Sequence, residues 1–90
     1  MITVGNIKIN LHTGEGLSEN YRRATVKEIF EKDVYRFDSV KEGGVVIDVG
    51  ANIGVFSIRC AIEKNCAVYA YEPSVETFKV LARNITDNNL

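Results

Sequence analysis

The sequence predicts an α/β fold whose centre is a parallel β-α-β-α unit, preceded by a β-hairpin and a short helix. An apolar run at residues 45–47 leads into a glycine-punctuated loop, and a second apolar run occupies residues 67–71. Between them lies a segment with helical patterning. Since a right-handed crossover returns the chain to the same sheet, we expect the two strands to pair in parallel.

The first elements along the chain are a predicted hairpin and a predicted short helix. Apolar residues alternate through residues 2–4 and 7–11, on either side of the Gly5-Asn6 pair, which favours a tight turn. Thr25 followed by Glu28 has the form of a capping box. This pattern predicts a short helix that ends near residue 33.

The central strand ends in an acid and a glycine loop. Val45, Val46 and Ile47 are β-branched, which is typical of a strand buried on both faces of a parallel sheet. Asp48 closes the strand. Gly50 and Gly54 then allow a sharp turn and a close approach of a ligand to the backbone. We expect a helix to follow, over residues 53–64.

The second strand ends at another acid. Residues 67–71 lead directly into Glu72, which lies 24 residues after Asp48. Because the carboxyl ends of parallel strands meet at one edge of a sheet, Asp48, the glycine loop and Glu72 should converge on one crevice. A carboxylate there can accept hydrogen bonds from two ribose hydroxyls, a feature that S-adenosylmethionine and NAD share.

The last element is a predicted helix after Pro73. Ser74 stands where a helix-capping residue is expected. A stripe of apolar residues at helical spacing follows, and we expect it to face the core: Val75, Phe78, Leu81, Ala82 and Ile85.

The glycine spacing distinguishes between two cofactors. A G-x-G-x-x-G fingerprint beginning at Gly50 would need glycines where Asn52 and Val55 stand, which argues against a dinucleotide. Read as D-x-G-x-x-x-G, the segment from Asp48 to Gly54 resembles the first motif of class I S-adenosylmethionine-dependent methyltransferases. Asn52 replaces a middle glycine, and asparagine adopts left-handed backbone angles more readily than most residues.

The segments 45–57, VVIDVGANIGVFS, and 68–85, VYAYEPSVETFKVLARNI, together resemble the FkbM family of methyltransferases. An I-D-V-G-A-N-I-G loop and a Y-x-x-E-P strand end recur in that family. The resemblance covers roughly residues 45–88 and implies the N-terminal part of a Rossmann-like class I methyltransferase fold. It also implies O-methylation of a small molecule, a glycan or a natural product, with S-adenosyl-L-methionine as the cofactor.

The candidate residues are expected to bind different groups of S-adenosyl-L-methionine. Backbone N–H groups of residues 51–54 suit its carboxylate, Glu72 suits its ribose, and Asp48 holds the loop amides or reaches its ammonium group. The full set of candidates is Asp48, Gly50, Ala51, Asn52, Gly54 and Glu72. The sequence identifies neither a catalytic base nor a metal site.

Length limits what the chain can do by itself. A class I methyltransferase sheet has about seven strands, whereas these 90 residues supply two parallel ones, so we expect an incomplete unit. Residues 1–42 are predicted to form a lead-in, and residues 43–90 the first half of the cofactor-binding domain. Acceptor-binding residues should lie beyond Leu90, and the chain alone should be inactive.

Composition excludes several other classes. A net charge of −1 gives no reason to expect nucleic acid as a partner, and no apolar run approaches the length of a membrane span. We expect a cytoplasmic protein. Cys60 and Cys66 fit no common zinc or redox spacing and are predicted to be buried thiols without a disulfide, and His12 is expected to be a surface residue without a role.

Three alternatives remain open at this point. A nicotinamide-dependent oxidoreductase shares the β-α-β architecture, although its glycine pattern is missing. An RNA methyltransferase uses the same cofactor pocket with a different acceptor. A truncated, non-catalytic chain would keep the fold without binding the cofactor.

Overall fold

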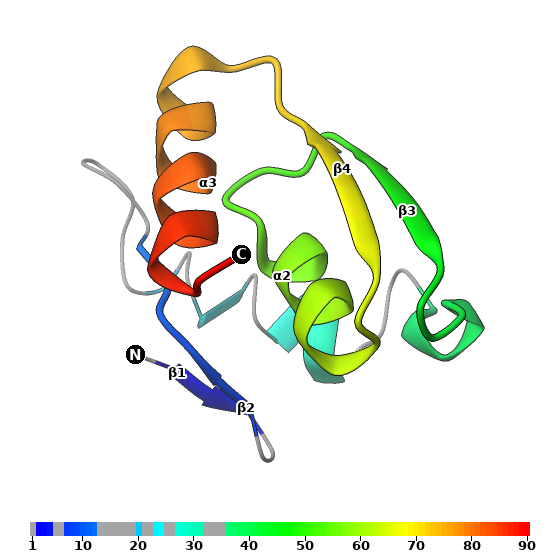
Figure 1. Cartoon of the computed structure of the whole chain (residues 1–90). Coiled ribbons are helices and arrows are strands. Elements are labelled where there is room, and N and C mark those ends of the chain that lie inside the picture. The colour runs from blue at the N-terminus through cyan, green and yellow to red at the C-terminus, as the bar shows by residue number, and fades with distance from the viewer. Residues whose placement is uncertain (1, 5–6, 13–19, 21–22, 25–26, 32–35) are drawn as a thin grey trace.

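The computed structural model describes residues 2–4, 7–12, 20, 23–24, 27–31 and 36–90 (Figure 1). The described elements follow one another along the chain as β1 (Ile2–Val4), β2 (Ile7–Ile9), the π-helical turn η1 (Lys27–Glu31), the 3₁₀ turn η2 (Phe37–Ser39), β3 (Val45–Val49), α2 (Val55–Glu63), β4 (Ala67–Tyr71) and α3 (Val75–Asp87).

The centre of the fold is the parallel pair β3–β4, joined by α2. The strands pair in register from Val45 opposite Ala67 to Val49 opposite Tyr71. This arrangement confirms the predicted parallel β-α-β-α unit and is compatible with a partial Rossmann-like fold. Helix α2 begins at Val55, two residues later than predicted, because the left-handed angles at Asn52 and Gly54 keep the loop non-helical up to that point.

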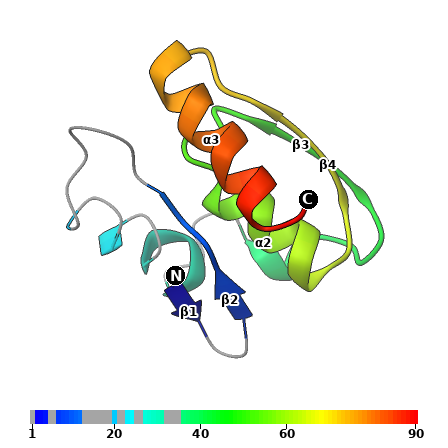
Figure 2. The same cartoon turned by 60° about the vertical axis from the view of Figure 1, so that its left-hand side comes forward.

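The N-terminal hairpin is also confirmed. Strand β1 pairs antiparallel with β2, with Ile2 opposite Ile9. The second strand ends at Ile9, two residues before its predicted end. Figures 1 and 2 both place this hairpin away from the parallel sheet, on the other side of α2.

The predicted short helix is described only in part. Residues 27–31 form one π-helical turn, whereas Thr25 and residue 33 lie outside the described residues. Arg59 of α2 holds this turn in place, since its Nη1 donates to the carbonyl oxygen of Ile29 at 2.9 Å. The same guanidinium stacks on the ring of Phe37, 3.6 Å from its centroid.

A group of buried apolar side chains lies between the N-terminal segment and α2. Among the described residues, it joins the N-terminal segment, the glycine loop and α2: Ile9, Leu11, Ile29, Ile53, Val55 and Ile58. Burial of these side chains holds the N-terminal segment against the glycine loop. The loop is therefore backed by packed side chains on its helix side.

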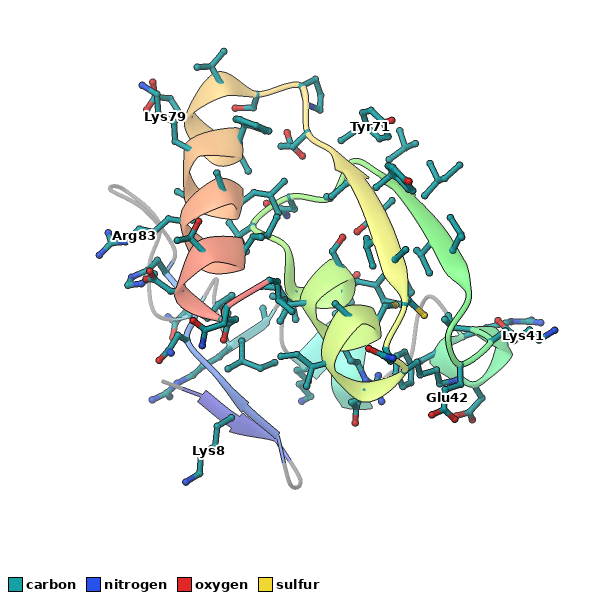
Figure 3. All side chains as sticks on the ribbon, in the orientation of Figure 1. Lys8, Lys41, Glu42, Tyr71, Lys79 and Arg83 are labelled. Atoms are coloured by element: carbon teal, nitrogen blue, oxygen red, sulfur yellow. The ribbon has the colours of Figure 1, made fainter. Side chains whose placement is uncertain are left out.

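The two faces of the parallel sheet differ in their burial. Helix α2 covers one face, whereas alternate residues on the other face are exposed: Val45, Ile47, Val49, Tyr69 and Tyr71. Figure 3 shows Tyr71 on this face, directed away from the helices. The prediction that β3 is buried on both faces is thus wrong for this chain, because its own helices cover a single face.

Only part of the apolar stripe of α3 is buried in the core. Leu81 is buried, but Val75 and Phe78 are 67% and 49% exposed, so the prediction that the whole stripe packs inside is wrong. Ala82 is exposed as well, and Ile85 is half-buried. Helical spacing correctly places these residues near one face, but in this chain little covers the first turns of the helix.

Asn84 of α3 connects three parts of the chain. Its side chain is fully buried, and its amide nitrogen donates to the carbonyl oxygens of Ile53 at 2.8 Å and His12 at 3.0 Å. Its Oδ1 accepts from the N–H of His12 at 2.7 Å. One side chain therefore fixes the N-terminal segment and the glycine loop to α3.

We expect Asn84→Ala to lower the free energy of unfolding by about 2 kcal/mol, because it leaves the buried carbonyl of Ile53 without this donor. Urea denaturation followed by circular dichroism measures the change. Thr86→Ala on the exposed side of the same helix is the control and should cost less than about 1 kcal/mol. Equal effects of the two substitutions would contradict the connecting role of Asn84.

Candidate cofactor-binding site

The loop between β3 and α2 is held in an unusual backbone conformation. Gly50, Asn52 and Gly54 have φ angles of 75°, 57° and 98°. The left-handed angle at Asn52 confirms that asparagine can take the place of a middle glycine here. The N–H groups of Gly50 and Ala51 both donate to the carbonyl oxygen of Tyr71 at 2.9 Å, so the loop is tied to the end of β4.

Glu72 binds the same loop through its side chain. Its Oε1 accepts from the N–H of Asn52 at 2.9 Å, and its Oε2 accepts from the N–H of Ser74 at 3.0 Å. The carboxylate therefore joins the glycine loop to the residue that caps α3. Glu72 thus meets the glycine loop as predicted, but it is absent from the described lining of the cavity that contains Asp48. Each carboxylate oxygen retains a second lone pair for a ligand hydroxyl.

Asp48 lies on the α2 side of the sheet. Its Oδ2 accepts a hydrogen bond of 2.6 Å from the Oγ of Ser57, the third residue of α2. The prediction that Asp48 closes the strand is one residue early, since β3 continues to Val49. The carboxylate also lines a cavity at the carboxyl end of β3.

That cavity has a volume of about 210 Å³ and is enclosed by the glycine loop, the start of α2 and the N-terminal segment. Its lining residues are Ala24, Glu28, Ile29, Asp48, Gly50, Ala51, Asn52, Ile53, Val55 and Phe56. Among the described residues of this lining, the ionisable groups are the carboxylates of Glu28 and Asp48. The cavity is therefore suited to a positively charged group.

Glu28 is a residue that the sequence analysis assigned only to helix capping. No pattern in the sequence places Glu28 at this cavity. The residue comes there because the neighbouring Ile29 packs into the same core cluster as Ile53. Such a contact between distant segments follows from packing, which one sequence alone does not reveal.

The loop amides have a different use from the one expected. We predicted that the N–H groups of residues 51–54 bind a carboxylate of the cofactor. In the structure those of Ala51, Asn52 and Gly54 donate to Tyr71, Glu72 and Ala51, respectively. These three groups fix the loop itself, and they are not available to a ligand in this conformation.

The cysteines and the histidine lie outside this cavity. Cys60 is buried and Cys66 is half-buried, and both are free thiols. Burial raises the pKa of the Cys60 thiol to about 11, and neighbouring Cys66 and Asp48 add to the rise, so the thiol is protonated at neutral pH. His12, for which no role was predicted, contacts Asp87 through its Nε2 at 2.6 Å.

Two features are absent from the described part of the chain. Within it, no group of three or more histidine, cysteine, aspartate or glutamate side chains is placed to hold a metal ion. In those same residues, no helix combines the length and the apolar character needed to cross a membrane.

Comparison with curated proteins gives several partial similarities. The chain is 47% identical over 49 residues to a tRNA (guanine(37)-N(1))-methyltransferase of Pediculus humanus subsp. corporis, covering 54% of this chain and 10% of that protein. It is 33% identical over 64 residues to methyltransferase sdnD of Sordaria araneosa, covering 70% and 25%, respectively. Over 78 residues it is 33% identical to the hexuronic acid methyltransferase AglP of Haloferax volcanii, covering 77% and 32%.

These similarities support a methyltransferase function in general terms. The chain spans at most about a third of the length of these relatives. No family model matches the chain, and no solved structure matches it.

Proposed function

We propose that this chain forms the S-adenosylmethionine-binding half of an FkbM-type O-methyltransferase. The observation that carries the proposal is the position of Glu72 against the left-handed loop that directly follows Asp48, with the Asn52 N–H bound by the Glu72 carboxylate. Two acids at the ends of adjacent parallel strands match the ammonium group and the ribose of that cofactor.

The described residues fit the cofactor in two respects. The cavity beside Asp48 and Glu28 presents negative charge, which suits the ammonium and sulfonium groups. Glu72 lies on the other side of Asn52, with lone pairs for a ribose diol. When bound, the cofactor supplies an electrophilic methyl group. The residues of this chain bind and orient it, because the packed core behind the loop keeps the two acids at fixed positions.

The acceptor we favour is a hydroxyl group of a glycan or another small molecule. The name of the relative AglP, a hexuronic acid methyltransferase, supports a sugar acceptor. A tRNA acceptor is the second candidate, because the tRNA methyltransferase relative is more similar over its shorter match. The net charge of −1 favours the first candidate, since a nucleic-acid surface requires a basic patch.

We expect the intact protein to bind S-adenosylhomocysteine, the product form of the cofactor, and not to bind NADH. Isothermal titration calorimetry measures both. The physical reason is that the glycine spacing of this loop does not provide the backbone approach that a pyrophosphate needs. A folded protein that binds NADH, or that binds neither molecule, would contradict the proposed function.

A further inference from the structure

The hydrogen bond between Ser57 and Asp48 lies between the helix and the proposed site. Ser57 is only 4% exposed, and its Oγ lies 2.6 Å from Oδ2 of Asp48. Helix α2 is fixed by the buried side chains of Val55 and Ile58 on either side of Ser57. The hydroxyl is therefore a donor in a fixed place.

The surroundings of Ser57 are otherwise apolar. The residue borders a second cavity of about 250 Å³, whose walls are mostly carbon atoms from α2, β4 and the end of α3: Ile58, Ala61, Cys66, Val68, Ala70, Ile85 and Leu90. An alanine or a larger apolar residue would suit such a place at least as well. The serine is therefore better explained by its bond to Asp48 than by packing.

Asp48 links Ser57 to the site described above. The carboxylate accepts from Ser57 through one oxygen, and the residue lines the cavity at the carboxyl end of β3. A hydrogen bond that holds Oδ2 restricts rotation of the carboxylate, so that Oδ1 is the oxygen left for a ligand.

We propose that Ser57 is a positioning residue that orients the Asp48 carboxylate toward the ammonium group of the bound cofactor. The inference rests on the proposed function and deepens it, because it assigns one residue to one end of the ligand. Ser57 acts through Asp48 and does not itself touch the ligand. Removal of the Ser57 hydroxyl should weaken binding of the amino-acid end of the ligand and leave binding of the nucleoside end unchanged.

The test compares two ligands with the intact protein. S-adenosylhomocysteine carries the amino-acid group, whereas 5′-methylthioadenosine has the same nucleoside without it. We expect Ser57→Ala to weaken S-adenosylhomocysteine binding about tenfold, because a carboxylate that is no longer held in place makes a weaker charged hydrogen bond to the ammonium group, and to change methylthioadenosine binding less than about twofold. Calorimetry gives both dissociation constants.

Matched variants separate positioning from packing. Ser57→Thr keeps the hydroxyl, and its added methyl group has room in the cavity that borders the residue, so it should retain the wild-type ratio of the two affinities. Cys60→Ala removes a buried atom one turn along the same helix and should also leave the ratio unchanged. In an Asp48→Asn background, Ser57→Ala should produce no further loss.

The outcomes distinguish this inference from the proposed function. If Ser57→Ala weakens the binding of both ligands equally, or of neither, the positioning role is wrong while the cofactor assignment stands. If the wild-type protein binds neither nucleoside, the proposed function itself is wrong. Should Ser57→Ala fail to fold, Ser57→Cys, whose thiol is slightly larger and a weaker donor, replaces it under the same criteria.

Discussion

Replacing Glu72 with alanine should weaken S-adenosylhomocysteine binding by about a hundredfold or more. The side chain accepts from the N–H groups of Asn52 and Ser74, and we propose that it also accepts from the ribose hydroxyls. Loss of two ligand hydrogen bonds to a charged group accounts for this magnitude. Calorimetry on the intact protein measures it. Unlike Ser57→Ala, Glu72→Ala should weaken binding of 5′-methylthioadenosine as much as binding of S-adenosylhomocysteine, since both ligands carry the ribose.

Two variants control for this result. Glu76→Ala removes an exposed acid from the first turn of α3 and should leave both affinities within about twofold of wild type. Glu72→Gln keeps one acceptor oxygen but replaces the other with a donor, so an intermediate loss is expected. Wild-type affinity in Glu72→Ala would remove this residue from the site.

Replacing Gly54 with alanine should lower the free energy of unfolding by about 3 kcal/mol. A β-carbon built at this position would lie 2.6 Å from Cδ1 of Leu81, whose side chain is fully buried and has little room to move. The φ angle of 98° adds backbone strain for any residue with a β-carbon. Urea denaturation of the variant and wild-type proteins measures the difference.

Gly50→Ala separates the two contributions. Gly50 also has a positive φ, of 75°, but a β-carbon built there meets nothing within 4 Å. Only the backbone strain, about 1–2 kcal/mol, is therefore expected. In a Leu81→Ala background, the cost of Gly54→Ala should fall toward that of Gly50→Ala. If the two glycine variants are equally stable, close packing against Leu81 is not what requires a glycine at position 54.

Much of the central unit could be predicted from the sequence because its signals are local. Val45 to Ile47 and residues 67–71 are short β-branched or alternating runs, and both are strands in the structure. Asn52 adopts the left-handed angle that its residue type favours. The approach of Glu72 to the glycine loop after Asp48 followed from topology, since parallel strands joined by a helix leave their carboxyl ends together.

The errors concern what covers each element. Alternation shows which residues of β3 share a face, and helical spacing does the same for α3, but neither pattern states whether another element packs there. Val45 is 69% exposed and Val75 is 67% exposed for that reason. Burial depends on contacts between segments distant in sequence.

In the candidate site, too, local sequence signals predicted some features, whereas others depend on packing between distant segments. Asp48, the glycine loop and Glu72 could be brought together from sequence, whereas the contribution of Glu28 to the cavity depends on how the N-terminal segment packs. The use of the loop amides was also missed, because the carbonyl of Tyr71 and the carboxylate of Glu72 reach them only once β4 is paired with β3. The roles of these residues toward a cofactor remain predictions.

The attachment of the N-terminal segment to α3 has a consequence for the order in which the chain can fold. Asn10 and His12 bind Asn88 and Asn84, partners 78 and 72 residues later in the sequence. During synthesis, Ile9 and Leu11 therefore stay uncovered until their core partners at residues 53–58 have been made, and the hydrogen bonds that fasten their segment form only after α3 has left the ribosome. Contacts of such long range close late and slow folding, so the nascent chain exposes these apolar side chains to chaperones and to other chains in the meantime.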